Sequence, residues 1–205
     1  MAITLQKGGN LSLSKADPGL ENVTVGLGWD ARSTNGQPFD LDASALLIGA
    51  NGKVRSDNDF VFYNQMGDVT DSSGKFADEA LASVIYGGDN RTGEGDGDDE
   101  TINIHLSKVP ADIERIVITV SIDQYAERGQ SFGQVRNAYV RVVNTDSDNE
   151  ISRYDLSEES SSETALIFAE VYRDKSASGE WKFKAVGQGY SDGLGGIARD
   201  FGVAI

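Results

Sequence analysis

The segment of this sequence with the most distinctive chemistry is a glycine-rich run of acids at positions 87–101, GGDNRTGEGDGDDET. It holds six acidic side chains and one arginine. Like charges about 4 Å apart repel by about 1 kcal/mol per pair even in water, so the run needs full solvation or a cation. Glycines let the backbone turn sharply and direct several carbonyls inward. Carboxylate, carbonyl and Asn amide oxygens together form the ligand set of calcium, which takes about six to eight oxygens.

A second pair of acids lies in Phe39-Asp40-Leu41-Asp42. Side chains two positions apart on an extended chain share one face, so Asp40 and Asp42 point the same way. With Asp30 or Asp59 nearby in space, they could complete the site of the acidic run or form another. We therefore expect one or two Ca²⁺ ions. The candidate ligands are Asp40, Asp42, Asp59, Asp89, Asn90, Asp96, Asp98, Asp99 and Glu100.

Other chemistry finds less support in the residues. Asp89 and Glu100 have the spacing of an EF-hand, but Glu94 stands where that loop needs glycine. Zinc or copper would need His or Cys, and the chain has one histidine, His105, and no cysteine. A solvated acidic loop, and exposed acids on the wet face of a sheet, remain the alternatives to a metal site.

The elements that must position these acids are strands. Short segments with period-two alternation recur along the chain and are separated by Gly, Asn, Asp and Ser turns, which favours an all-β antiparallel sandwich. The predicted strands are 23–29, 45–48, 60–63, 102–106, 116–122, 138–143, 165–172 and 181–185. One or two short helices are expected, at 78–83 and 194–201. Trp29 and Trp181 are expected to be core residues.

A shift of 93 residues reveals an internal repeat, roughly 20–106 and 113–187, within one domain spanning 1–205. It places Asp30, Gly36, Gln37, Phe39 and Ala45 on Asp123, Gly129, Gln130, Phe132 and Ala138. Asp40 and Asp42 fall on Gly133 and Val135, and the connection matching the acidic run is the charge-balanced RDKSASGE. Because the second half builds the same elements without these carboxylates, folding does not require them, which indicates a function.

Composition excludes several classes of protein. The net charge is −15 over 205 residues, which disfavours nucleic-acid binding, because phosphates need a basic surface. No apolar run is long enough to insert into a membrane. We expect a cytoplasmic globular protein.

Several motifs in order resemble the TerD family of tellurium-resistance and stress proteins. They are Val25–Asp30 (VGLGWD), Phe39–Ala45 (FDLDASA), Asp59–Asn64 (DFVFYN), Gly88–Gly93 (GDNRTG), Gly97–Glu100 (GDDE), Gln130–Val135 (QSFGQV), Arg153–Leu156 (RYDL) and Gly179–Phe183 (GEWKF). The resemblance implies a calcium-binding β-sandwich with a role in tolerance of tellurite and other stresses.

Three hypotheses about activity follow. The first is a non-enzymatic calcium-dependent adaptor or sensor that works through other stress-resistance proteins. The second is a calcium-dependent carbohydrate-binding module, and the third is a metal-assisted hydrolase. Direct binding of tellurite is not expected, because it is an oxyanion and this chain is strongly negative; reducing it would need thiols or a redox cofactor, which the sequence does not suggest.

Overall fold

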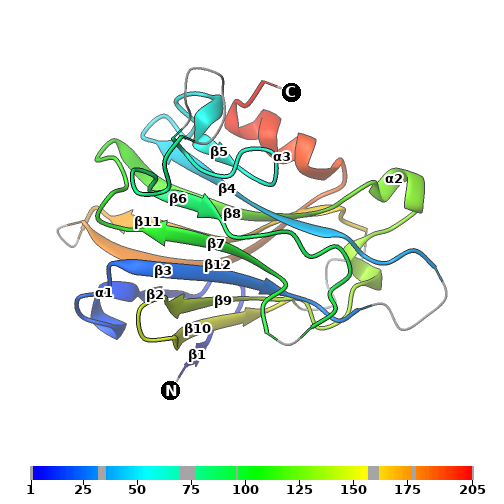
Figure 1. Ribbon diagram of the computed structural model, residues 1–205, viewed down its shortest axis with the longest axis horizontal. Coiled ribbons are helices and arrows are strands. Elements are labelled where there is room, and N and C mark those ends of the chain that lie inside the picture. Colours follow the sequence, from blue (N-terminus) through cyan, green and yellow to red (C-terminus); the bar gives the residue numbers. More distant parts are fainter. Residues whose placement is uncertain are drawn as a thin grey trace.

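Two β-sheets stack face to face in the computed structural model, and their inner faces share the main core (Figure 1). The structure describes residues 2–31, 36–69, 77–95, 97–156, 162–176 and 179–204. The expectation of a β-sandwich is confirmed. In these ranges, no helix is long and apolar enough to cross a membrane.

Each sheet has six strands in the described part of the chain. The first has the order β1 (Ile3–Thr4), β10 (Asn149–Asp155), β9 (Tyr139–Asn144), β3 (Asn22–Gly28), β7 (Glu100–His105) and β6 (Val84–Tyr86). The second has the order β2 (Asn10–Ser12), β12 (Glu180–Tyr190), β11 (Ala165–Asp174), β8 (Ile113–Ile122), β4 (Leu41–Gly49) and β5 (Phe60–Val61). All pairings are antiparallel except that of β1 with β10.

The two halves of the chain exchange strands between the sheets. The 93-residue shift places β3 on β8 and β4 on β9. In the structure β4 pairs with β8, and β9 pairs with β3, so the second strand of each half lies beside the first strand of the other. The outer strands break the symmetry, because β3 continues to β7 whereas β8 continues to β11. Strand exchange therefore decides which acids meet.

β4 is buried along its whole length because both of its faces are covered. Leu41, Ala43, Ala45 and Leu47 point into the core between the sheets. Leu46 and Ile48 point the other way, into a second apolar cluster. Asp42 shares that outer side by the two-residue period of a strand, but it lies at the end where the apolar cover stops.

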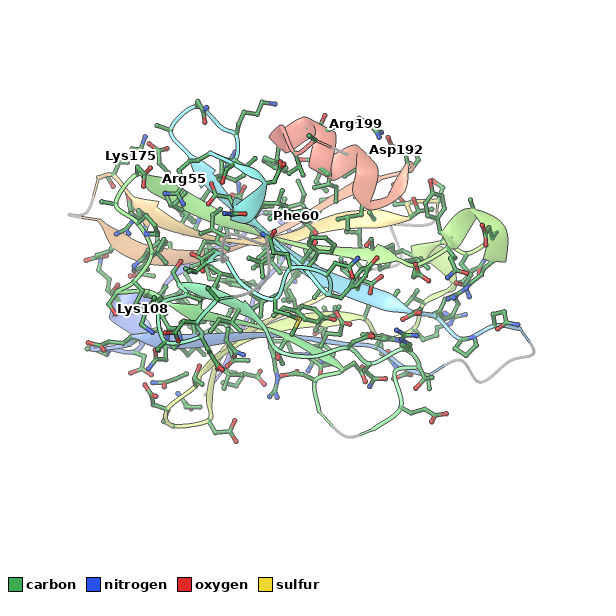
Figure 2. The ribbon with its side chains drawn as sticks, turned by 45° about the horizontal axis from the view of Figure 1, so that its top comes forward. Arg55, Phe60, Lys108, Lys175, Asp192 and Arg199 are labelled. Atoms are coloured by element: carbon green, nitrogen blue, oxygen red, sulfur yellow. The ribbon has the colours of Figure 1, made fainter. Side chains whose placement is uncertain are left out.

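The cover of the second cluster is the helix α3 (Gly193–Phe201). Its residues Ile197, Ala198 and Phe201 recur at helical spacing and pack on Leu46, Ile48 and neighbouring side chains, Phe60 among them. The charged Asp192 and Arg199 lie on the outer side of the helix (Figure 2). The predicted helix over 194–201 is confirmed.

The helix expected at 78–83 is wrong. Asp78 accepts a hydrogen bond from the Ala80 N–H, and the carboxylate of Asp68 takes the N–H groups of Ser83 and Val84. These bonds make a turn that leads directly into β6. Two short helices were not expected, α1 (Leu13–Ala16) and α2 (Tyr125–Arg128), and two 3₁₀ turns span Asp57–Asp59 and Phe132–Gln134.

Candidate metal centre

The candidate site begins at an unpaired stretch of the β4 edge. The edge strand β5 pairs with β4 only at Ala45 and Leu46, so the start of β4 lacks a partner on that side. Glu100, at the start of β7, reaches across from the other sheet and accepts a hydrogen bond from the Ala43 N–H. Its other oxygen accepts from the Tyr86 hydroxyl at 2.7 Å. The carboxylate thus closes the sheet edge beside Asp42.

Three of the predicted ligands lie together at this edge. Asp40 precedes β4, Asp42 lies within it, and Asp89 follows β6 after two glycines. One carboxylate oxygen from each lies within 4.8 Å of the others. Oxygens bound to one calcium at about 2.4 Å can be at most about 4.8 Å apart, so the spacing fits a shared ion.

These carboxylates open onto a cavity of about 220 Å³, which we call the acidic pocket. Its lining is Asp40, Asp42, Tyr63, Asp89, Arg91, Asp123, Gln124 and Arg128. Arg91 pairs with Asp89 at 3.0 Å, and Arg128 pairs with Asp123 at 3.3 Å and with Asp40 at 3.8 Å. In the part of the chain that the structure describes, Asp42 has no ion-pair partner. Four carboxylates therefore face two guanidinium groups.

Burial raises the pKa of two acids beside this pocket. The pKa of Asp42 rises to about 7, first because the side chain is desolvated and then because Asp40, Asp123 and Asp89 repel its charge. The pKa of Glu100 rises to about 8, chiefly by desolvation, although its two hydrogen bonds oppose the shift. Burial also raises the pKa of Asp40. Desolvation is the first cause of each shift, so burial disfavours the charged form of these acids, and a bound cation would favour it.

Unlike Glu100, Asp98 lies away from the pocket. Asp98 lies on the outer face of the first sheet, where its Oδ1 accepts from the Arg141 Nε at 2.7 Å and the Tyr139 hydroxyl at 3.1 Å. A β-carbon on Gly26 would lie 2.0 Å from the Asp98 carboxylate, so glycine in β3 admits this side chain. Asp98 therefore has a protein cation of its own and stands apart from Asp40, Asp42 and Asp89.

Asp99 and Asn90 organise the loop itself. The Asp99 carboxylate accepts from the backbone N–H of Trp29 at 2.9 Å and from the side-chain amide of Asn90 at 2.8 Å. The side-chain Oδ1 of Asn90 accepts from the backbone N–H groups of Thr92 and Gly93, which makes an Asx turn. Both side chains already have protein partners. Asp96 lies outside the described residues.

Asp59 does not join the site. Its carboxylate forms a bidentate salt bridge with the Arg55 guanidinium, at 2.7 Å to Oδ1 and 2.9 Å to Oδ2. It also accepts a hydrogen bond from the Arg55 backbone N–H at 2.7 Å. Arg55 lies on the side of the molecule that carries α3 (Figure 2). The expectation that Asp59 completes the site of Asp40 and Asp42 is therefore not met.

The 93-residue shift relates the acidic pocket to a second cavity of about 780 Å³, which we call the indole pocket. Its lining is Trp29, Asp30, Ala31, Phe39, Gly93, Glu94, Gly95, Gly133, Gln134 and Arg136. Asp30 stands where the acidic pocket has Asp123, and Gly133 stands where it has Asp40. Trp29 is 4% exposed, as expected of a core residue, and its indole N–H has no acceptor among the described residues.

The sequence prediction missed Asp123, which lines the pocket in place of Asp30. The signal was present, because Asp123 is the repeat counterpart of Asp30. Recognising its role required knowing that β4 pairs with β8, which brings Asp42 opposite Ser121 near the end of that strand. Tyr63 and Arg128 were missed as well; Tyr63 lies in the DFVFYN motif, whereas Arg128 lies in none of the motifs named above.

Residues 1–201 match the TerD domain family. The chain belongs to the TerD family. It is 54% identical over 203 residues to the tellurium resistance protein TerD of Serratia marcescens, covering 99% of this chain and 98% of that protein. It is 47% identical over 206 residues to general stress protein 16U of Bacillus subtilis, covering all of both chains.

Solved structures support the fold of this TerD-family chain. One is the crystal structure of a TerD homologue, SCO6318 from Streptomyces coelicolor, with a TM-score of 0.63 at 24% identity over 88% of this chain and 96% of that one. Another is SAV2460, a protein of unknown function, with a TM-score of 0.67 at 24% identity over 91% and 99% of the two chains. At this identity the likeness concerns the fold alone.

Proposed function

We propose that this TerD-family protein binds calcium in the acidic pocket. The observation that carries the proposal is Asp42, which is 9% exposed, faces the cavity and has no cationic partner in the described part of the chain. A buried carboxylate is costly unless it is paired or bound to a metal. Asp40 and Asp89 bring two further oxygens to within the spacing of a single ion.

The donor set favours calcium over the other common metals. Carboxylates are hard oxygen ligands, and loop carbonyls and water can supply the rest of a calcium shell. One ion fits the three clustered acids. Asp98, Asp99 and Asn90 would act by holding the loop in place, since each is already bonded within the protein.

The cellular role that we propose follows the names of the relatives, tellurium resistance and general stress response. The protein would work in the cytoplasm as a calcium-dependent adaptor or sensor, through other stress-resistance proteins. It would not bind tellurite, because an oxyanion is repelled by a net charge of −15 and the chain has no cysteine thiol to reduce it.

Calorimetry on EDTA-treated, dialysed protein tests the calcium site. We expect heat on titration with Ca²⁺ and a higher melting temperature, since a ligand at a hundredfold excess over Kd stabilises a fold by about 2.7 kcal/mol. Magnesium at the same concentration is the control, and we expect it to bind more weakly because it gives up water reluctantly. No heat and no thermal shift with calcium would contradict the proposal.

One observation favours the carbohydrate-binding alternative. Tyr63 is 44% exposed and lines the acidic pocket, so an aromatic ring lies beside the proposed ion. Trp29 and Trp181 are both buried and offer no such platform. Calorimetry with neutral monosaccharides in saturating calcium distinguishes the two functions, because saccharide binding that Tyr63→Ala abolishes would favour this alternative.

We also propose that the protein is not an enzyme. Its acidic pocket would bind an ion to order the loop and the β4 edge and would not process a substrate. Calcium-dependent hydrolysis of phosphoester or glycoside substrates that disappears in Asp42→Asn would overturn this part and support the hydrolase hypothesis.

A further inference from the structure

The acidic pocket already contains a cation that belongs to the protein. Arg128 stands at the last position of α2, a helix of four residues, and its side chain is 21% exposed. Its guanidinium lies 3.3 Å from an oxygen of Asp123 and 3.8 Å from an oxygen of Asp40. The other arginine, Arg91, is 75% exposed and pairs with Asp89 at the outside of the pocket. Arg128 is thus the inner counter-charge of the pocket.

We propose that Arg128 is a built-in counter-cation that competes with the bound calcium ion, so that loading of the pocket releases α2. This inference rests on the proposed function, because it needs an ion in the acidic pocket. Arg128 would lower the affinity for calcium, and calcium would weaken the hold of Asp40 on Arg128. The two effects are one coupling free energy, seen from each side.

The competition follows from shared ligands. Asp40 contributes to the cluster that fits calcium and also pairs with Arg128. A Ca²⁺ ion at the three clustered oxygens would place a charge of +2 close to the guanidinium. Like charges in a half-buried site repel more strongly than in water. Arg128 would keep its contact with Asp123 only in part, since that contact is 3.3 Å and is shared with the Gln124 amide at 2.7 Å.

The backbone and packing of α2 would allow the helix to move when calcium binds. The residue before the helix, Gln124, has φ 49°, and Gly129 after it has φ 61°. Left-handed backbone is uncommon for a long side chain such as Gln and is often found at functional sites. None of the four helical residues is buried. Tyr125 is the residue of α2 that packs against the core, so little apolar contact holds the helix in place.

Removing the counter-cation tests the first half of the inference. We expect Arg128→Gln to bind calcium about fivefold more tightly than the unaltered protein. Arg128→Lys keeps the charge and should stay within about twofold. Unchanged or weaker binding by Arg128→Gln, or equal tightening by both variants, would overturn the role of Arg128.

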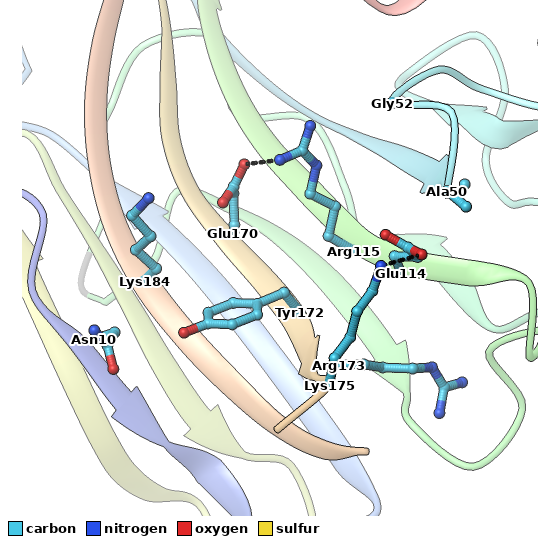
Figure 3. Close-up of a pocket in the computed structure, with 11 residues that line it drawn as sticks. Asn10, Ala50, Gly52, Glu114, Arg115, Glu170, Tyr172, Arg173, Lys175 and Lys184 are labelled. Atoms are coloured by element: carbon cyan, nitrogen blue, oxygen red, sulfur yellow. Dashed lines mark ion pairs between the residues drawn. The ribbon is translucent and has the colours of Figure 1, made fainter. Parts of the chain in front are cut away.

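A matched control separates this effect from the general change in charge. Arg115 pairs with Glu170 at 3.3 Å in a groove at the other end of β8 (Figure 3). Asp123 lies eight positions along the chain from Arg115, about 27 Å on an extended strand. This exceeds the screening length of about 8 Å at physiological ionic strength. Arg115→Gln removes the same charge and should leave the calcium affinity unchanged; tightening equal to that of Arg128→Gln would overturn the inference.

The other part of the inference is that calcium releases α2. Because the chain has no cysteine, a spin label can be attached at a single introduced cysteine to measure this movement. Ala126→Cys places a single exposed label site on the helix, and Ser107→Cys places one on an exposed turn as the control. We expect calcium to increase the mobility of a nitroxide at position 126 and leave position 107 unchanged. In Arg128→Gln the label at 126 should be mobile already without calcium.

The outcomes separate the two proposals. If calorimetry detects calcium binding while the label at 126 does not respond, the release of α2 is wrong and the calcium site stands. If calorimetry detects no binding, the proposed function fails and the inference fails with it.

Discussion

The acidic pocket and the indole pocket are built by equivalent parts of the two halves but differ in charge. The acidic pocket gathers Asp40, Asp42, Asp89 and Asp123 around two arginines. The indole pocket has Asp30 at the position of Asp123, and glycine at the position of Asp40. Because strand exchange sets both pockets at the end of the sandwich, the difference shows that the fold does not demand clustered carboxylates.

The two pockets also differ in how their acids are satisfied. Asp30 accepts a hydrogen bond from the Asn137 side-chain amide at 2.7 Å, so its carboxylate has a protein donor. Asp42, by contrast, is buried, and three other acids repel its charge. The loop between β6 and β7 runs between the pockets, giving Asp89 to one and packing Gly93 against Trp29 in the other. We therefore expect changes in the two pockets to separate binding from loop packing.

The largest contrast should come from neutralising one acid in each pocket. Asp42→Asn removes the central carboxylate of the proposed calcium site, and we expect calcium affinity to fall at least about a hundredfold. Asp30→Asn makes the same chemical change in the indole pocket and should leave the affinity within about twofold. Calorimetry measures both values.

Asp98→Asn provides a second control within the acidic run. Asp98 is held by Arg141 on the outer face of the first sheet, so its loss should cost little calcium affinity. A fall as large as that of Asp42→Asn would show that the whole acidic run, and not the acidic pocket, forms the site.

A substitution at Gly93 tests the packing of the loop on the indole pocket. A β-carbon there would lie 2.4 Å from the Trp29 Nε1, and φ is +68°. We expect Gly93→Ala to lower the free energy of unfolding by about 1–3 kcal/mol, measured by urea denaturation. Gly129→Ala is the matched control, because φ is +61° and no atom lies within 4 Å. Equal losses in both variants would mean that backbone strain alone matters and the contact with Trp29 does not.

The acidic pocket should also give the metal-free protein a distinctive pH dependence. The pKa of Glu100 is about 8 in the folded state against 4.5 in a free side chain, and that of Asp42 is about 7 against 3.8. Between pH 4.5 and 8 the folded chain therefore keeps protons that the unfolded chain releases. Stability in EDTA should fall as the pH rises through this window, by at most about 1.4 kcal/mol per pH unit for each proton.

Two comparisons test whether Glu100 and Asp42 cause this loss of stability with rising pH. Glu100→Gln mimics the protonated side chain and should flatten the decline in melting temperature. Calcium should raise the melting temperature more at pH 8 than at pH 6, because it replaces the missing protons. A decline with the same slope in Glu100→Gln would assign the effect to the overall negative charge.

Much of the fold could be predicted because its signals are local. Period-two alternation predicts β3 and β8 within a few residues, and apolar spacing over 194–201 predicts α3. The sequence could not show that 78–83 is not a helix, because the deciding contact is with Asp68, fifteen residues before Ser83. Its carboxylate accepts the Ser83 backbone N–H that a helix would use. Such side-chain capture depends on tertiary structure.

The candidate site was predictable in part for the same reason. The proximity of Asp40 and Asp42 follows from strand periodicity, and glycines beside Asp89 signal a loop that can approach them. Separating Asp98 from the site required knowing that Arg141, 43 residues away on β9, lies beside it. Arg55 lies only four residues before Asp59, so that pair is local, but the sequence does not show that the two side chains turn toward each other. Charge alone predicts that acids need partners and does not say which partner each acid finds.

The smallest effect should come from Arg91, the exposed arginine at the mouth of the acidic pocket. It pairs with Asp89 at 3.0 Å and is 75% exposed, so water and salt screen the contact. We expect Arg91→Gln to tighten calcium binding by about twofold at low ionic strength and by less than Arg128→Gln, because Arg128 lies deeper in the pocket. The gain should vanish in about 1 M KCl, where the screening length is only about 3 Å. A gain from Arg91→Gln that equals that of Arg128→Gln and survives high salt would mean that depth in the pocket does not set the strength of the competition.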